Sequence, residues 1–282
     1  MGQNREMLLS VCGERNVDML YRDDPEGRIA ITQPAHAWLS GQLARAWGNE
    51  HFGEVVPWEE VCLGAEQHDV GHTVWEQAPR LNPQTGLPYS FLEMPRQWHV
   101  RLWSSAARLV LPQGRYAALL VSLHGTGLYE NYDAATDTPE NAQAVQDYLA
   151  QERAFQQELL TTLRADPHYR SYATEETVAR NRRLLRVWDA LSLYICFGGW
   201  QTKSLPRVPT AASATTLKLS AHDGDPTHLM VTPWPFRREQ VTLVYEGRYL
   251  AETFSSEAMM REALKQAPWV TLQTTLFPDQ PE

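Results

Sequence analysis

Apolar residues recur every three or four positions between residues 34 and 197. In the stretch that opens at Pro34, the side chains of His36, Leu39, Leu43 and Trp47 fall on one face of a helix. Proline suits the first turn of such a helix. The same period marks segments that begin near Pro57, Pro95 and Tyr116, and segments that span residues 139–164 and 175–197. The pattern predicts a bundle of amphipathic helices.

Apolar and polar residues alternate instead near both ends of the sequence. Alternating stretches occupy residues 7–12, 18–21, 28–32, 216–220, 241–245, 249–253 and 269–276. A period of two is typical of strands. Glu246 and Gly247 separate two of these stretches, so we expect a hairpin turn there. Residues 256–266 have the pattern of a short helix.

Together these patterns predict a mainly α fold, close to all-α, with small β or α+β elements at the N-terminus and the C-terminus. The change of period near residue 205 divides the chain into two predicted domains. We expect residues 1–204 to form a helical domain with an N-terminal β element. Residues 205–282 are expected to form a small α+β appendage packed on that core.

Composition and charge exclude several classes of protein. With 43% hydrophobic and 21% charged residues, the chain is neither collagen-like nor disordered. A net charge of −9 disfavours nucleic acids and anionic membranes as partners, because both attract clustered Lys and Arg. The longest apolar run, residues 116–123, is far shorter than the roughly 20 residues of a membrane span. Without a convincing signal sequence, we expect a cytoplasmic protein. Three cysteines without a CxxC pair favour free thiols.

Several predicted helices place a potential metal ligand on the face that should be apolar. These inward residues are His36, His68, Asp69, His99, His124 and Asp189. Burying a polar group is unfavourable unless it has a partner, and burying a carboxylate is more so. One inward histidine alone is more often bonded to a carbonyl than to a metal, but a converging set favours a shared divalent cation. Neutral imidazole suits Zn, Fe, Ni or Mn.

Four of these residues lie in the segments PAHAWLSGQLARAW, EQHDVGHTVWE and RVWDALSLYIC. The order His36, His68-Asp69, Asp189 resembles the signature of the HD superfamily of metal-dependent phosphohydrolases. Together with YAALLVSLHGTGLY, the same segments resemble a bacterial family of unknown function, DUF3891, over most of residues 28–200. The resemblance implies an α-helical, HD-like core, and little established activity.

The HD resemblance also implies a ligand set for one or two divalent ions, with Mn, Fe, Zn, Ni or Mg as candidates. The first ion would be held by His36, His68, Asp69 and Asp189. The second would be held by His99, His124 and Asp69, which bridges the two ions and is the expected catalytic residue. Di-iron oxygenases of the superfamily have the same ligand order.

Four further residues are candidates for the lining of the site. His72 follows His68 by four positions, but HDVGH lacks the glutamate of the metalloprotease motif HExxH. Glu66, Arg182 and Arg186 complete the set, and the two arginines could meet an anionic substrate or could simply form a solvated helix face. Trp75, Glu76 and Trp188 are interpreted as supporting residues. His51, His168, His222 and His228 are predicted to be solvated.

The function indicated first is a metal-dependent phosphohydrolase or phosphodiesterase that acts on a small, soluble, anionic phosphate compound. The sequence has no phosphate-binding glycine loop, which argues against nucleotide binding by such a loop. It also has no GxSxG motif that would offer a covalent nucleophile. Two alternatives stay open: a di-iron oxygenase, and a non-catalytic protein that binds a ligand or a partner. Neither the substrate nor the oligomeric state follows from the sequence.

Overall fold

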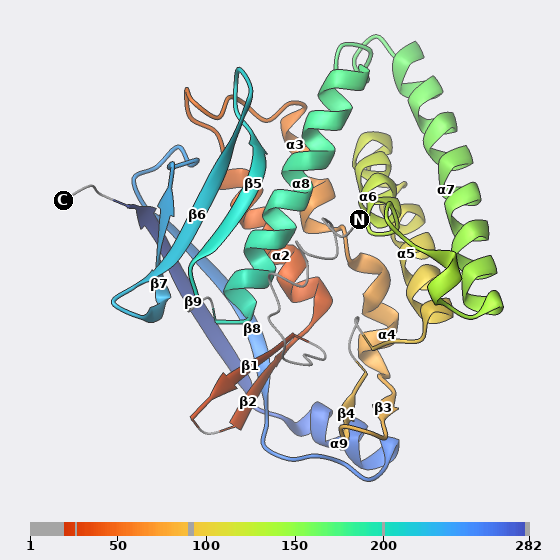
Figure 1. The fold of residues 1–282 in the computed structure, drawn as a ribbon, viewed down its shortest axis with the longest axis vertical. Helices are drawn as coiled ribbons and strands as arrows, with labels where there is room; N and C mark the ends of the chain where they lie inside the picture. The colour runs from red at the N-terminus through yellow and green to blue at the C-terminus, as the bar shows by residue number, and fades with distance from the viewer. Residues whose placement is uncertain (1–19, 26, 90–92, 199–200, 280–282) are drawn as a thin grey trace.

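Helices occupy one side of the molecule and a curved sheet the other (Figure 1). The computed structural model describes residues 20–25, 27–89, 93–198 and 201–279. The helices are α2 (Gln33–Ala46), α3 (Trp58–Glu66), α4 (Thr73–Gln77), α5 (Arg96–Val110), α6 (Arg115–Gly127), α7 (Pro139–Ala165), α8 (Glu175–Cys196) and α9 (Glu257–Gln266), with short 3₁₀ turns η1 (Val70–His72) and η2 (Ala134–Thr136). The helices predicted from periodicity are therefore confirmed, apart from their exact ends.

Local signals explain where the long helices begin. The side chains of Thr32, Thr138 and Thr174 each accept a hydrogen bond from the third residue that follows, which satisfies a free backbone N–H. Helices α2 and α8 both pack against the sheet, and most of the second half of α8 is buried. Trp188 on α8 meets Trp47, the residue after the end of α2, edge to face, with ring centroids 5.9 Å apart.

The sheet has seven strands and corrects the prediction of a mainly α, all-α fold. Its order is β1 (Leu20–Asp24), β2 (Gly27–Ile31), β8 (Val241–Leu250), β9 (Trp269–Pro278), β7 (Asp225–Thr232), β6 (Ala214–His222) and β5 (Lys203–Pro209). Strands β7 and β9 are parallel and the other neighbours are antiparallel. The two short strands β3 (Leu81–Asn82) and β4 (Leu87–Pro88) pair separately. The fold is therefore α/β.

The correction has a physical reason. Each end of the sequence showed only short alternating stretches, which suggested small separate elements. Strand β2 pairs with β8, so strands from both ends of the chain share one sheet. The predicted strand at residues 7–12 lies outside the described residues. The boundary between residues 204 and 205 stays a prediction.

The hairpin predicted at Glu246 and Gly247 is also wrong, because β8 runs straight through both residues. A Cβ added at Gly247 would lie 2.5 Å from Cγ2 of Ile29 and 3.0 Å from the carbonyl oxygen of Ala30. The glycine is therefore needed for the close approach of β2 to β8 and not for a turn.

Among the described residues, no helix combines the length and the apolar composition that crossing a bilayer requires.

Candidate metal centre

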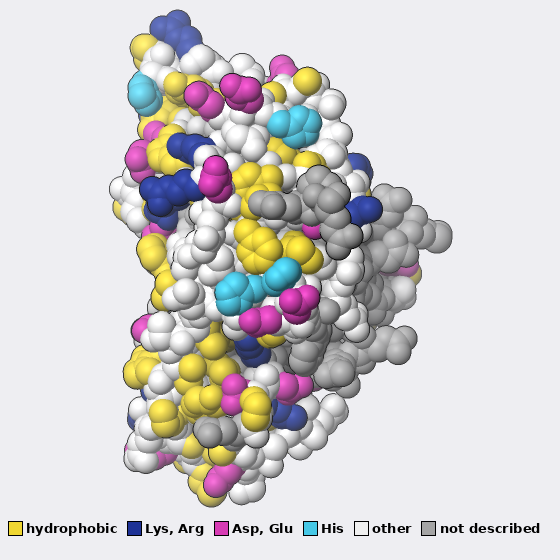
Figure 2. Space-filling model, turned by 90° about the vertical axis from the view of Figure 1, so that its left-hand side faces the viewer, with side chains coloured by type: hydrophobic (Ala, Val, Ile, Leu, Met, Phe, Trp, Pro, Cys, Tyr) yellow, Lys and Arg dark blue, Asp and Glu magenta, His cyan; other side chains and the backbone are white. Residues whose placement is uncertain are grey.

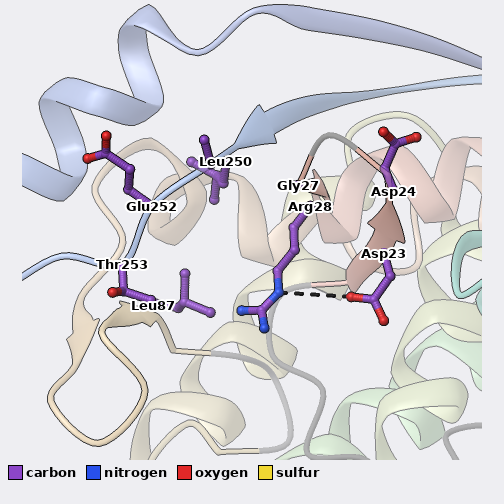
Figure 3. A pocket seen from close by; sticks show the side chains of 9 residues that line it. Asp23, Asp24, Gly27, Arg28, Leu87, Leu250, Glu252 and Thr253 are labelled. Carbon is purple, nitrogen blue, oxygen red and sulfur yellow. Dashed lines mark ion pairs between the residues drawn. The ribbon is translucent and has the colours of Figure 1, made fainter.

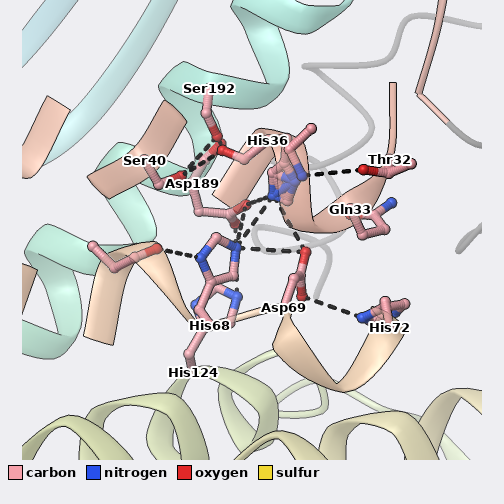
Figure 4. Close-up of polar contacts among 12 residues, drawn as sticks. Thr32, Gln33, His36, Ser40, His68, Asp69, His72, His124, Asp189 and Ser192 are labelled. Atoms are coloured by element: carbon pink, nitrogen blue, oxygen red, sulfur yellow. Dashed lines mark hydrogen bonds and ion pairs between the residues drawn. The ribbon is translucent and has the colours of Figure 1, made fainter. Parts of the chain in front are cut away.

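Five inward residues come together from four parts of the helical layer (Figure 4). His36 lies on α2, His124 on α6 and Asp189 on α8. His68 and Asp69 lie in the turn between α3 and η1, because α3 ends at Glu66, earlier than predicted. All five are buried.

The distances between donor atoms are those of ligands around one ion. Nε2 of His36 lies 3.2 Å from Nε2 of His68, 3.3 Å from Oδ2 of Asp69 and 3.3 Å from Oδ1 of Asp189. Nε2 of His68 lies 3.6 Å from Oδ2 of Asp69 and 3.5 Å from Oδ1 of Asp189. Two ligands each about 2.1 Å from a metal lie about 3.0–3.4 Å apart at octahedral to tetrahedral angles. His36, His68 and Asp189 each offer one ligand atom, and these three atoms all lie within 4.8 Å of one another.

Hydrogen bonds behind the cluster orient it. Nδ1 of His68 donates to the carbonyl oxygen of Ala65 over 2.7 Å, which leaves the lone pair of Nε2 facing the other ligands. Ser40 on α2 donates to the hydroxyl of Ser192, 2.9 Å away, and Ser192 donates to the carbonyl oxygen of Asp189 over 2.8 Å. These bonds join α2 and α8 where each carries a ligand.

The electrostatics of the cluster favour a bound cation. Burial lowers the pKa of His68, but the carboxylates of Asp69 and Asp189 outweigh burial and raise that pKa to about 9. Burial and the nearby Asp189 raise the pKa of Asp69 to about 7, although His68 opposes them. Burial, with the neighbouring imidazoles, lowers the pKa of His36 well below its ordinary value. The raised pKa of His68 shows that the two buried carboxylates attract positive charge, and a divalent cation that replaces the His68 proton neutralises them.

The two histidines assigned by resemblance to a second ion lie differently. His124 borders the cluster: its Nε2 lies 3.9 Å from Oδ2 of Asp189, and its ring centroid lies 4.7 Å from that of His68. Both ring nitrogens of His99 are already engaged. Its Nε2 accepts a hydrogen bond from the indole of Trp103 over 3.0 Å, and its Nδ1 lies 2.7 Å from the hydroxyl of Tyr129. His99 therefore offers no free nitrogen to a metal in this arrangement.

The candidate lining residues divide into two groups. His72 is buried and its Nδ1 lies 3.6 Å from Oδ1 of Asp69. Glu66 forms an ion pair with Arg45 near the surface. Arg182 and Arg186 both pair with Glu130, so their guanidinium groups have a partner within the protein.

Some supporting residues escaped the sequence analysis although a signal was present. Ser40 lies four positions after His36, and Trp103 lies four positions after His99, so helical spacing places each beside its histidine. Tyr129 gave no such signal, because it follows the end of α6. Glu76 does support α2: its carboxylate accepts a hydrogen bond from the backbone N–H of Gln33 over 3.0 Å.

Histidines predicted to be solvated are confirmed in that role. His51, His168, His222 and His228 are all exposed. Figure 2 shows histidines among acidic side chains on the outer surface. His222 and His228 each lie beside an aspartate, at 3.6 Å and 2.9 Å.

A pocket of about 740 Å³ lies elsewhere, between the β1–β2 turn and the end of β8 (Figure 3). Arg28 crosses it toward Asp23, with 3.9 Å between Nε and Oδ1. Its lining includes none of the inward histidines. The chemistry indicated by the sequence therefore belongs to the buried cluster and not to this pocket.

Comparison with known protein families gives a match over most of the chain. The family described as "Protein of unknown function (DUF3891)" matches residues 19–252. Searches of the curated proteins and of the solved structures found no match. The HD resemblance is not tested by these comparisons and stays a prediction. Because the family match covers well over half of its length, the chain belongs to the DUF3891 family.

Proposed function

We propose that this protein is a metal-dependent hydrolase of a small, anionic phosphate ester. The observation that carries the proposal is the convergence of Nε2 of His36, Nε2 of His68 and carboxylate oxygens of Asp69 and Asp189 at 3.2–3.6 Å. Groups of this kind are the ligands that Mn, Fe, Zn and Ni take in proteins. The same residues are nearly inaccessible to water. A bound divalent cation would therefore offset the free-energy cost of burying these polar groups without a partner.

A divalent cation bound there supplies positive charge that lowers the pKa of water and screens the phosphate oxygens. The protein's own groups prepare the site for it. Ala65 fixes the tautomer of His68, and the hydroxyls of Ser40 and Ser192 hold α2 against α8. Asp69, with one oxygen directed at the cluster and one directed away from it, is the group that can orient a water molecule.

The surroundings support an anionic substrate. Burial and the neighbouring His68 are the main causes of the low pKa of His124. Arg186 and Arg182 lie close enough to lower this pKa further. Two guanidinium groups share the single carboxylate of Glu130, so these three side chains together keep one net positive charge. Arginine also matches the geometry of phosphate oxygens.

The test is metal analysis followed by a hydrolysis screen. Untagged protein is stripped with a chelator, reloaded with Mn, Fe, Zn or Ni, and assayed with p-nitrophenyl phosphate, bis(p-nitrophenyl) phosphate and a panel of nucleotides. We expect stoichiometric metal and turnover, both lost in His36→Gln and Asp189→Asn and kept in His168→Gln, whose imidazole is exposed. Protein that holds no metal under any loading condition would refute the proposal. Bound iron with oxygen consumption and no ester hydrolysis would favour an oxygenase.

A further inference from the structure

The pocket between the β1–β2 turn and the end of β8 shares no lining residue with the buried cluster (Figure 3). Its volume of about 740 Å³ lies in the range of small-molecule sites, roughly 300–1,000 Å³. The register of the sheet places three lining residues in one row, because Asp23 lies opposite Arg28 and Arg28 lies opposite Leu250. Residues opposite each other share a face of the sheet, and neighbouring strands lie about 4.8 Å apart. The row therefore runs from an acidic through a basic to an apolar side chain.

Hydrogen bonds and close packing hold the walls of the pocket in place. The backbone N–H of Phe254 donates to the carbonyl oxygen of Gly86 over 2.7 Å, which fixes the segment after β8 against the turn between β3 and β4. A Cβ at Gly86 would lie 3.0 Å from Cβ of Thr253, so the two segments approach closely. On the opposite wall, the hydroxyl of Tyr249 donates to Oδ1 of Asp24 over 3.0 Å. The lining therefore belongs to a fixed frame.

An apolar floor separates charged side chains at the two ends of the pocket. Leu87 and Leu250 form this floor and belong to a small apolar core that is separate from the main one. Figure 3 shows Arg28 and Asp23 on one side of the two leucines and Glu252 on the other. Methylene groups of a ligand that lay across the leucines would be removed from water, which favours binding. The pocket thus suits a long molecule with an aliphatic middle and polar ends.

The charged groups of the lining are open to a ligand. Nε of Arg28 lies 3.9 Å from Oδ1 of Asp23, and among the described residues no hydrogen bond engages the guanidinium. A guanidinium with free donors matches the two oxygens of a carboxylate. Glu252 forms no ion pair within the described part of the chain. The carboxylates of Asp23, Asp24 and Glu252 outnumber the single guanidinium, so the lining favours a ligand of net positive charge.

We propose that this pocket binds a free amino acid with a long basic side chain, such as lysine or arginine. Arg28 takes the α-carboxylate, and Asp23, which lies beside Arg28, takes the α-ammonium group. The aliphatic part of the side chain lies across Leu87 and Leu250, and its terminal cation meets Glu252. The opposite charges that neighbour each other in the pocket thus match the two that neighbour each other in an amino acid. This binding site is independent of the buried cluster and of the proposed hydrolysis.

The experiment uses calorimetric titration of the full-length, chelator-treated protein, because amino acids also bind free metal ions. The probes are L-lysine, L-arginine and two analogues of lysine: cadaverine, which lacks the α-carboxylate, and L-norleucine, which lacks the terminal ammonium group. We expect wild type to bind both analogues at least about tenfold more weakly than lysine, because each loses one charged contact.

Two variants assign these contacts to residues. Arg28→Gln should weaken lysine binding about tenfold and leave cadaverine binding unchanged, and Glu252→Gln should weaken lysine binding about tenfold and leave norleucine binding unchanged. Arg153→Gln and Glu158→Gln are the matched controls, because both side chains are exposed on α7, and they should bind lysine as wild type does. Circular dichroism checks that each variant is folded.

Several results would overturn the inference. Wild type that binds neither lysine nor arginine at millimolar concentrations would do so. Equal affinity for lysine and either analogue would do so too, because one of the two charges would then not be recognised. Lysine affinity that is unchanged in Arg28→Gln or in Glu252→Gln would overturn the arrangement in the pocket. The comparison of lysine with its analogues needs wild type alone, so it decides the question even if a variant fails to fold.

Discussion

Replacing Gly71 with alanine should disturb the buried cluster proposed to bind metal, although Gly71 itself has no side chain that could be a ligand. Gly71 lies within η1, between Asp69 and His72. A Cβ at this position would lie 2.1 Å from the carbonyl oxygen of Leu102 on α5, whereas real Cβ contacts stay beyond 3.0 Å. The obstacle is backbone, so η1 and α5 must separate by about 1 Å, and a misplacement of this size costs about 10²-fold in rate.

The same clash has an effect on stability. Overpacking of this kind costs about 1–3 kcal/mol, and each kcal/mol lowers the melting temperature of a chain of this size by about 2–4 °C. The assays are thermal unfolding followed by circular dichroism and titration of Mn²⁺ by calorimetry. Gly114→Ala is the matched control, because a Cβ at Gly114 meets nothing within 4 Å.

We expect Gly71→Ala to bind Mn²⁺ more weakly and to melt at a lower temperature than Gly114→Ala. If the two variants bind metal equally and melt together, the close packing of η1 against α5 does not position Asp69. The reasoning from the glycine contact would then be refuted.

Three further predictions concern the groups around the cluster. Burial, opposed by the hydrogen bond from Gln33, raises the pKa of Glu76 to about 8. The unfolded chain releases this proton near pH 4.5 and the folded chain keeps it. The contribution of Glu76 to the free energy of unfolding is therefore fully present below pH 4.5 and is lost as the pH rises to about 8. Glu76→Gln should lack this decline. Urea unfolding of the chelator-treated wild type and of the variant at pH 5 and pH 8 measures it, and an equal loss of stability in the two proteins would contradict the prediction. Ser40→Ala and Ser192→Ala should each lower stability by about 1 kcal/mol. The double variant should lose less stability than the sum of the two single losses, because each single variant already breaks the hydrogen bond between Ser40 and Ser192. Additive losses would show that this bond does not contribute to stability. Glu66→Gln should change stability by less than about 1 kcal/mol, because its ion pair with Arg45 is partly exposed, and should leave metal affinity unchanged, which calorimetry checks.

The helical part of the fold follows from periodicity, and so does much of the cluster. His36, His124 and Asp189 recur with apolar residues on their helices, and that phase brings them together in the structure. Spacing cannot tell whether an inward histidine is free. The partners of His99 are Trp103, on its own helix, and Tyr129, which lies beyond the next helix, and only the fold brings the tyrosine within 2.7 Å.

The sheet exceeds what local pattern can supply. Alternation marks a strand, but it does not say which strand lies beside it, and β2 pairs with a strand that follows more than two hundred residues later. Strands β5 and β7 escaped because their alternation is irregular and β5 contains Pro206 and Pro209. Gly247 misled for a related reason: Glu-Gly is a turn signal locally, while the close approach of Ile29 is decided by the tertiary structure.

The strand order has a consequence for how the chain is made. Strand β9 lies between β8 and β7 and joins the two halves of the sheet, yet it follows every other strand in sequence. On the ribosome, residues 269–278 emerge after the rest of the sheet, so until then β7 and β8 each keep an edge unpaired. A nascent chain stalled before residue 269 should therefore be recognised by chaperones that bind exposed strands, and release of β9 should end that recognition.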